Sequence, residues 1–225
     1  MKKFSVLLVA FALMAAVVLP GCSNDNDDPD PTAVTKILVA TDATWPPFEY
    51  VDTATNKIVG FDIDLMNAIA AKAGFEVEFI NVEWDPLLAG VAQGTYDASI
   101  SSITITAERQ KVMLFSDPYH SAGQIIVVLA SNNTITGANN ISGKVGVQSG
   151  TTGDAEVSAM PGVEKVAFDD IGLAFTALMT NQIDAVVCDT PVADGYISTN
   201  PGKLKTVGEM LSAEEYGIAL PKGNE

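Results

Sequence analysis

Residues 87–102 read LLAGVAQGTYDASISS, and residues 175–189 read FTALMTNQIDAVVCD. Each stretch begins with apolar residues at helical spacing, turns through polar residues, and continues from Asp-Ala into an apolar run that ends in polar side chains. This change of periodicity predicts a helix, a short turn and a buried strand. Its recurrence predicts two lobes of similar build, with a chance repeat of common helix-strand chemistry as the alternative.

The surrounding sequence extends the alternation of strands and helices. Gly74 stands where a helix end favours a left-handed residue, and Asp85 followed by Pro86 is typical of a capped helix start. The alternation predicts an α/β fold with largely parallel sheets flanked by helices. The expected strands are 36–41, 48–51, 58–61, 76–81, 125–129, 144–148, 165–168 and 185–188, and the expected helices are 62–73, 85–93, 171–180 and the segments after 153 and 191.

The first 35 residues read as a leader and a linker. Two lysines, an apolar run over 4–19 and the sequence Leu-Pro-Gly before Cys22 predict an export signal over 1–21. The cysteine at that place resembles the lipobox of bacterial-type lipoproteins, which implies lipidation of Cys22 and attachment to a membrane surface. An ordinary signal peptide or an uncleaved anchor is the alternative. Residues 22–35 are acidic with hardly any apolar residues, which predicts a solvated tether rather than a metal site.

The net charge, the cysteine content and the chain length limit the possible partners, cross-links and number of domains. The formal net charge is −16, which argues against nucleic acid and anionic membranes as partners. The only cysteines are Cys22 and Cys188, so with the first lipidated no intrachain disulfide is available. About 190 residues remain after the tether, enough for one large or two small domains. We expect a monomer without a cofactor or metal.

Polar residues after the predicted strands are the candidate site, because ligands of open α/β sheets bind beyond the carboxyl ends of strands. Arg109, the only arginine, follows a strand and offers a planar grip for a carboxylate, although an exposed ion pair is the alternative. Residues 148–153, QSGTTG, place backbone N–H groups between a strand and a helix, where they attract an anion or form a plain turn.

Asp189 supplies the opposite charge. It ends the strand over 185–188, and its carboxylate is expected either to accept an ammonium group or to cap the next helix. Arg109 with Thr152 for a carboxylate, and Asp189 with Thr104 for an ammonium, would together recognise a free α-amino acid. Two loop tryptophans, Trp45 and Trp84, either sandwich the ligand or simply pack in the core.

Eight motifs in this order and spacing resemble one family, the extracytoplasmic solute-binding proteins of ABC importers for polar amino acids (family 3). The resemblance covers 36–225 and is closest to the histidine, lysine-arginine-ornithine and glutamine types. It implies the two-lobed periplasmic-binding-protein fold (type II), delivery of the ligand to an ABC transporter permease, and no enzyme activity. The motifs are ATD at 40–42, PFE at 47–49, VGFDIDL at 59–65, ITITAER at 103–109, FSDPY at 115–119, SGTT at 149–152, DTP at 189–191 and YGIA at 216–219.

The resemblance also implies roles for single residues. Arg109, Thr104 and Thr152 match positions that hold the ligand carboxylate, and Asp189, assisted by Ser102, matches the ammonium position. The side-chain pocket and its neighbourhood comprise Asp42, Trp45, Trp84, Ser101, Gln148 and Thr151. Lobe one would span 36–119 with 217–225 and lobe two 124–212, joined by hinges near 120–124 and 212–216.

Two departures from the family pattern bear on the ligand. Cys188 and Gln148 replace a histidine and a lysine of the glutamine-binding branch, so glutamine specificity is not supported. The sequence stops at Glu225, where the family continues into a C-terminal helical segment that packs on lobe one, so we expect either that this is a fragment of a longer chain or that lobe one is incomplete, with weaker binding as the consequence. Asp42 and the tryptophans favour a polar or basic amino acid.

Two rival functions use the same fold. Some relatives of this fold are dehydratases or parts of wall-cleaving proteins, but the single histidine, His120, lies at the expected hinge and no catalytic triad can be assembled. A binding protein that presents its closed form to a sensory receptor would use the same pocket, and the sequence does not separate that role from import.

Overall fold

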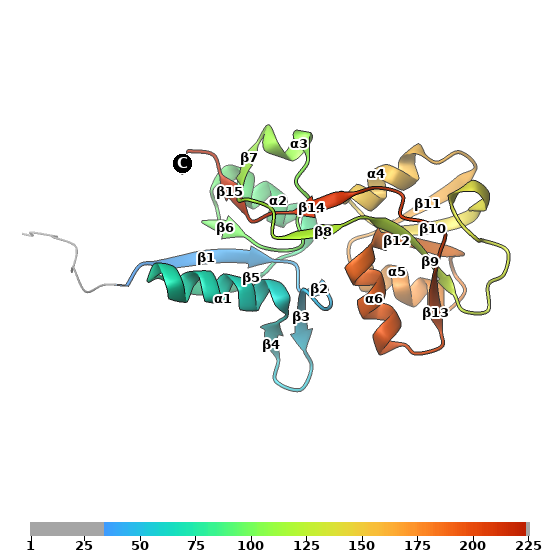
Figure 1. Cartoon of the computed structure of the whole chain (residues 1–225), viewed down its shortest axis with the longest axis horizontal. Helices are drawn as coiled ribbons and strands as arrows, with labels where there is room; N and C mark the ends of the chain where they lie inside the picture. Colours follow the sequence, from blue (N-terminus) through green and yellow to red (C-terminus); the bar gives the residue numbers. More distant parts are fainter. Residues whose placement is uncertain (1–33, 224–225) are drawn as a thin grey trace, which may run out of the picture. The chain divides into compact units, whose positions relative to one another are not determined.

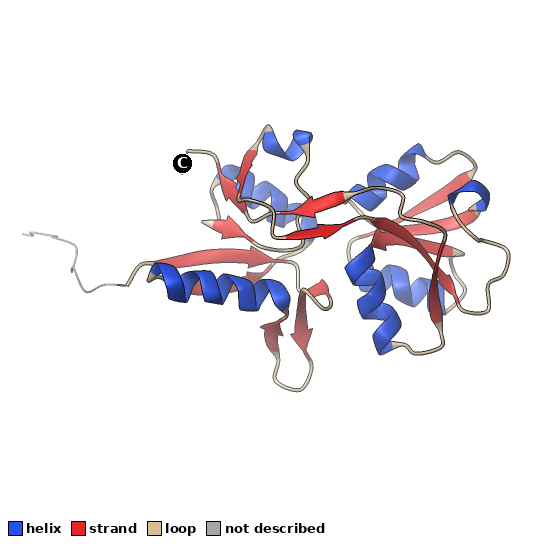
Figure 2. Ribbon diagram, in the orientation of Figure 1, coloured by secondary structure: helices blue, strands red, loops and turns tan. Residues whose placement is uncertain are grey.

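The computed structural model describes residues 34–223, so the leader, most of the tether and Cys22 lie outside the described residues. Two five-stranded sheets, each flanked by helices, form the framework (Figures 1 and 2). Parallel strands in each sheet are joined through helices, as the alternation of strands and helices predicts. Among the described residues, no helix is both long and apolar enough to cross a membrane.

The first sheet has the order β5-β1-β6-β15-β7. Its parallel part is β5, β1 and β6, and β15 pairs antiparallel with β6 and β7. Helices α1 (Phe61–Ala73) and α2 (Trp84–Gln93) cover its two faces. The strands are β1 (Lys36–Thr41), β5 (Glu76–Asn81), β6 (Ala98–Ser99), β7 (Met113–Phe115) and β15 (Ala219–Pro221).

Strand periodicity explains how this sheet is covered on both sides. Val39 of β1 packs in the cluster that contains Met66 of α1, while its neighbour Ala40 packs with Leu87 of α2. All four side chains are at most 4% exposed. Because successive residues of a strand point to opposite faces, a continuous apolar run is needed when both faces are buried.

The second sheet has the order β11-β10-β12-β9-β13 and repeats this plan. Here β10 pairs in parallel with β11 and β12, and β9 pairs antiparallel with β12 and β13. Helices α5 (Ile171–Met179) and α6 (Thr190–Thr199) pack on one face, and α4 (Thr152–Ala159) packs on the other. The strands are β9 (Gln124–Leu129), β10 (Gly143–Gln148), β11 (Val163–Phe168), β12 (Ala185–Asp189) and β13 (Leu204–Val207).

Short elements complete the described chain. The strands β8 (His120–Ala122) and β14 (Glu214–Tyr216) form an antiparallel pair on the segments that run between the sheets (Figure 1). A small hairpin sheet precedes α1, in the order β2-β3-β4. Its strands are β2 (Thr44–Trp45), β3 (Glu49–Asp52) and β4 (Lys57–Val59), and the remaining helices are α3 (Ala107–Gln110) and the 3-10 turn η1 (Ala138–Asn140).

The main differences from the sequence prediction are local. The sheets are largely parallel, as predicted, with one strand in each, β15 and β9, running antiparallel to the other four. Helix α2 begins at Trp84, and Glu83 rather than Asp85 occupies the N-cap position, with no side-chain capping bond. Asp85 instead lies in the first turn, where a negative charge favours the helix dipole.

Candidate functional site

Polar residues from both sheets meet at the carboxyl ends of their parallel strands. Asp42 follows β1, Ser101 follows β6, Gln148 ends β10 and Asp189 ends β12. The amide of Gln148 connects the two sheets, since its Nε2 donates to Asp42 Oδ2 at 2.8 Å and its Oε1 accepts from Trp45 Nε1 at 2.6 Å. Equivalent strand ends in the two halves therefore face one site, as the repeated sequence pattern predicts.

The end of the site around Asp42 is acidic. Asp42 is buried, and this burial raises the pKa of its carboxyl to about 6, although hydrogen bonds from Gln148 and Thr44 oppose the shift. A cavity of about 540 Å³ lies beside it, and its lining includes further carboxylates. A cationic side chain would compensate this charge, whereas an anionic one would add to it. The lining residues are Asp42, Thr44, Asn81, Glu83, Asp169, Asp170 and Leu173.

Arg109 lies against the ring of Trp84 and is not among the residues that line the acidic cavity. Its guanidinium carbon is 5.1 Å from the centre of the Trp84 ring, and Trp84 stacks with Trp45 at 6.2 Å between ring centres. Arg109 Nη1 donates to Thr104 O at 2.9 Å, and Nη2 donates to Gly150 O at 3.4 Å. Within residues 34–223 the ion pairs all use lysine, so the alternative of an exposed Arg ion pair is not observed.

Burial affects both charged groups proposed for a zwitterion. It lowers the pKa of Arg109, and the nearby carboxylates of Asp189 and Glu214 oppose that shift. It raises the pKa of Asp189 to about 7, with repulsion from Glu214 adding to the shift. Asp189 Oδ1 accepts from Gln124 Nε2 at 2.7 Å, and Oδ2 accepts from Tyr216 OH at 2.6 Å. Although Asp189 is the N-cap residue of α6, its side chain makes no capping bond, so its carboxylate serves the site.

A buried acidic pair fixes the serine loop after β6. Ser101 Oγ and Ser102 Oγ donate to the two oxygens of Glu49 at 3.2 Å, and Ser102 N donates to Asp62 Oδ2 at 2.9 Å. Burial raises the pKa of Asp62 to about 6 and that of Glu49 well above its ordinary value, so the pair favours holding a proton. These bonds stabilise Ser102 in the left-handed region, at φ 48°.

The threonine hydroxyls of the site converge on a residue that sequence reasoning missed. Thr104 Oγ1 and Thr152 Oγ1 donate to Glu214 Oε2 at 2.7 Å and 2.9 Å. Gln124, which is fully buried, donates from Nε2 to Thr152 Oγ1 and to Asp189. A cavity of about 760 Å³ adjoins this group and is lined in part by Thr104, Thr152 and Glu214.

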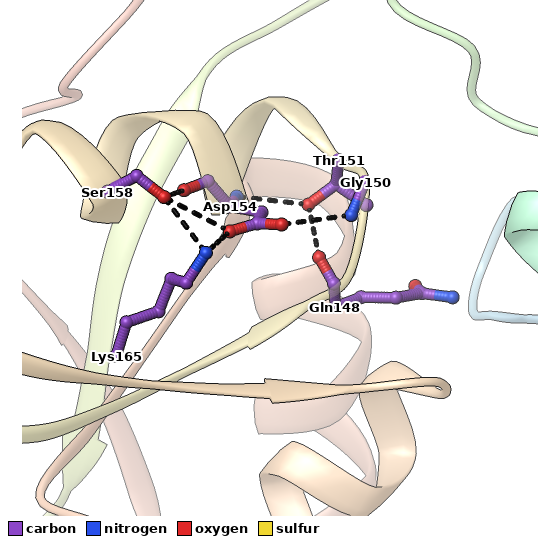
Figure 3. Close-up of polar contacts among 6 residues, drawn as sticks. All are labelled: Gln148, Gly150, Thr151, Asp154, Ser158 and Lys165. Carbon is purple, nitrogen blue, oxygen red and sulfur yellow. Dashed lines mark hydrogen bonds and ion pairs between the residues drawn. The ribbon is translucent and has the colours of Figure 1, made fainter.

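Thr151 has a different role from its neighbour Thr152. Its hydroxyl donates to Gln148 O at 2.8 Å and accepts from Asp154 N at 3.2 Å, which caps α4 (Figure 3). Asp154 in turn accepts from Gly150 N at 3.0 Å and pairs with Lys165. Figure 3 shows the Gln148 side chain extending away from this capped turn. The turn therefore holds Gln148 in place, and the Thr151 hydroxyl is occupied by capping.

The structure thus brings together Asp42, Trp45, Trp84, Ser101, Ser102, Thr104, Arg109, Gln148, Thr152 and Asp189, with the Thr151 hydroxyl turned to capping. Gln124, Glu214 and Tyr216 complete the site. A signal for Glu214 exists in the strand period, because Tyr216 and Glu214 are two residues apart and share a face. Within the part of the chain that is described, no group of three or more His, Cys, Asp or Glu residues forms a metal site.

Comparison with known proteins agrees with this geometry. A family model described as bacterial extracellular solute-binding proteins, family 3, matches residues 37–224. The chain belongs to this family. A probable histidine-binding protein of Neisseria gonorrhoeae is 34% identical over 100% of this chain and 86% of its own length.

Solved structures of family members share the fold. The arginine-bound ArgBP of T. maritima is 41% identical, with a TM-score of 0.79 over 83% of this chain and 88% of its own. The arginine-, lysine-, histidine-binding protein ArtJ of Geobacillus stearothermophilus is 37% identical, with a TM-score of 0.80 over 85% of this chain and 84% of its own. The type II binding-protein fold expected from the motifs is therefore confirmed.

The buried carboxylates predict an unusual dependence of stability on pH. The pKa of Asp189 is about 7 in the folded protein against an ordinary value of 3.8, so the folded state binds the extra proton and stability falls as pH rises from about 4 to 7. We expect chemical unfolding to give a free energy a few kcal/mol greater at pH 5 than at pH 7.5. Asp189→Asn should flatten this dependence, whereas Asp64→Asn, at an exposed position on α1, should not. Equal slopes for the two variants would refute the assignment.

Proposed function

We propose that this family 3 protein binds a free basic or polar L-amino acid outside the cytoplasm and delivers it to the permease of an ABC importer. The observation that carries the proposal is a partly buried guanidinium, Arg109 on α3, within the electrostatic influence of a buried carboxylate, Asp189 at the end of β12. A zwitterion would satisfy both. Relatives named as histidine- and arginine-binding proteins support the same class of ligand.

Each charge of the ligand has its own set of residues in this proposal. Arg109 holds the α-carboxylate through two N–H groups, joined by the hydroxyls of Thr104 and Thr152. Asp189 accepts the α-ammonium, and Ser102 assists. Asp42, Gln148 and Ser101 face the ligand side chain, and Trp45 and Trp84 provide flat walls beside it. The acidic cavity next to Asp42 favours a side chain that ends in a cation.

Two substitutions separate recognition of the amino acid from recognition of its side chain. Arg109→Ala should weaken binding of every amino acid at least about 100-fold, because a buried charge-assisted pair is lost. Asp42→Asn should weaken L-arginine or L-lysine about tenfold or more and leave uncharged ligands nearly unchanged. Isothermal titration measures both, with Lys111→Ala, an exposed cation beside Arg109, as the control. Equal losses for charged and uncharged ligands in Asp42→Asn would contradict the proposed division.

We further propose that the two sheets belong to lobes that close on the ligand, with hinges near 120–124 and 212–216. The β8–β14 pair lies on these segments. Contacts between the lobes would favour closure when the ligand touches both. One such contact is unusually close, since a Cβ added to Gly195 of α6 would lie 2.2 Å from Pro46 O.

Gly195→Ala tests closure, because its methyl group would hold α6 away from the loop at Pro46. Ligand affinity should fall about tenfold or more, while the melting temperature should not fall, since alanine favours a helix over glycine. Asp194→Ala, an exposed neighbour on α6, is the control. Unchanged affinity in Gly195→Ala would argue against the proposed closure.

Lipidation of Cys22 is the proposed means of attachment to the membrane. In a bacterial host, the wild-type protein should partition with membranes, and Cys22→Ser should appear in the soluble extracytoplasmic fraction, as judged by immunoblotting. Cys188→Ser, at a buried position in the second sheet, controls for loss of a thiol. Retention of Cys22→Ser in the membrane fraction would contradict lipid anchoring.

A further inference from the structure

Glu214 supplies a carboxylate from the hinge strand to the centre of the site. Its Oε2 accepts from Thr104 Oγ1 at 2.7 Å, from Thr152 Oγ1 at 2.9 Å and from Gln124 Nε2 at 3.4 Å. Its other oxygen, Oε1, accepts from Ser212 Oγ at 2.8 Å. Three donors from separate segments therefore converge on a single carboxylate oxygen.

The same donors are the ones assigned above to the ligand carboxylate. A hydroxyl group has one proton to donate, so Thr104 and Thr152 serve either Glu214 or a ligand carboxylate at one time. Two carboxylates sharing these donors in this partly buried position would also repel each other. Binding of an amino acid in the assigned pose therefore requires Glu214 to give up these contacts.

We propose that Glu214 is an internal competitor of the ligand's α-carboxylate: amino acids must displace it, while amines without a carboxylate are bound with Glu214 left in place. This inference rests on the proposed function, because it uses the assigned positions of Thr104 and Thr152. The proposed competition predicts a further class of ligand for the cleft, the decarboxylated basic amino acids. Glu214 thereby sets how strongly the site discriminates between an amino acid and its amine.

The orientation of the Gln124 amide reflects the two carboxylates that it faces, Asp189 and Glu214. Its Nε2 donates to Asp189 Oδ1 at 2.7 Å and is directed toward Glu214, whereas its Oε1 is buried without a hydrogen-bond partner. An unpaired buried oxygen is costly, so the two carboxylates determine this orientation of the amide. The opposite orientation would direct an oxygen at two negative charges.

The charges around the cleft favour an amine over a zwitterion while Glu214 stays in place. Asp189 and Glu214 both act on Arg109, so two carboxylates face one guanidinium. An amine adds the missing positive charge, whereas a zwitterion adds a carboxylate as well. The adjoining cavity of about 760 Å³, whose lining includes Ser121, Met210 and Glu215, offers space for a displaced Glu214 side chain.

The test compares amino acids with their decarboxylated amines in the wild type and Glu214→Gln. The pairs are L-arginine with agmatine, L-lysine with cadaverine and L-histidine with histamine, titrated calorimetrically at pH 8. For the pair that binds, Glu214→Gln should raise the amino acid's affinity about tenfold and lower the amine's affinity about tenfold. Opposite signs are expected because one ligand competes with Glu214 and the other depends on it.

Glu209→Gln is the matched control, since it removes the same charge from an exposed residue five positions earlier that does not line this cavity. It should change both affinities less than twofold. Glu214→Asp retains the charge on a shorter side chain and should also raise amino acid affinity, which keeps the test valid if Glu214→Gln folds poorly.

Two results would overturn the inference. A change of the same sign for an amino acid and its amine would show that Glu214 only positions the site, and no change would show that it does not compete. If neither wild type nor variants bind any of these amino acids or amines, although circular dichroism shows them folded, the proposed function itself is wrong and this inference falls with it. Amino acid binding by Glu214→Gln alone would support strong competition.

Discussion

The buried carboxylate of Asp189 is the constraint around which the site is arranged. It sits at the end of β12, and its hydrogen bonds come from neutral donors, the amide of Gln124 and the phenol of Tyr216. Such donors reduce the cost of burying the carboxylate but do not neutralise its negative charge, so burial still raises its pKa to about 7. Arg109 and the strand β14, through Glu214 and Tyr216, lie around this charge, and a ligand cation would complete the compensation.

A second set of buried carboxylates, Glu49 and Asp62, stabilises the serine loop of the site. Glu49 and Asp62 are both fully buried and together receive hydrogen bonds from Ser101 and Ser102. Neighbouring buried carboxylates favour sharing a proton. Glu49 and Asp62 therefore act as a hydrogen-bonded pair that fixes the serine loop, not as two separate charges. The hydrogen bonds to this pair offset the cost of the left-handed backbone at Ser102.

Much of the fold and part of the site could be predicted from the sequence. The residues that were missed or misassigned were so for physical reasons that can be named. The α/β alternation and the place of Asp189 at a strand end follow from periodicity, whereas Asp42 entered the predicted pocket only through the resemblance to the family. Glu214 was missed because its segment was predicted only as a hinge, and the face that it shares with Tyr216 in the short strand β14 was the one available signal. Thr151 was counted among ligand-binding residues because a capping hydroxyl and a binding hydroxyl look alike in sequence; only the geometry shows its bonds to Gln148 and Asp154.

The stacked tryptophans give the molecule an optical property. The sequence contains only two tryptophans, Trp45 and Trp84, and both are buried beside the candidate site with ring centres 6.2 Å apart. All indole emission from this protein therefore originates at one place. The indole N–H of Trp45 donates to the side-chain amide oxygen of Gln148, and the Arg109 guanidinium lies over the Trp84 ring. Whatever enters or rearranges the cleft changes the environment of every emitting group, so the native chain carries its own fluorescent reporter without a label.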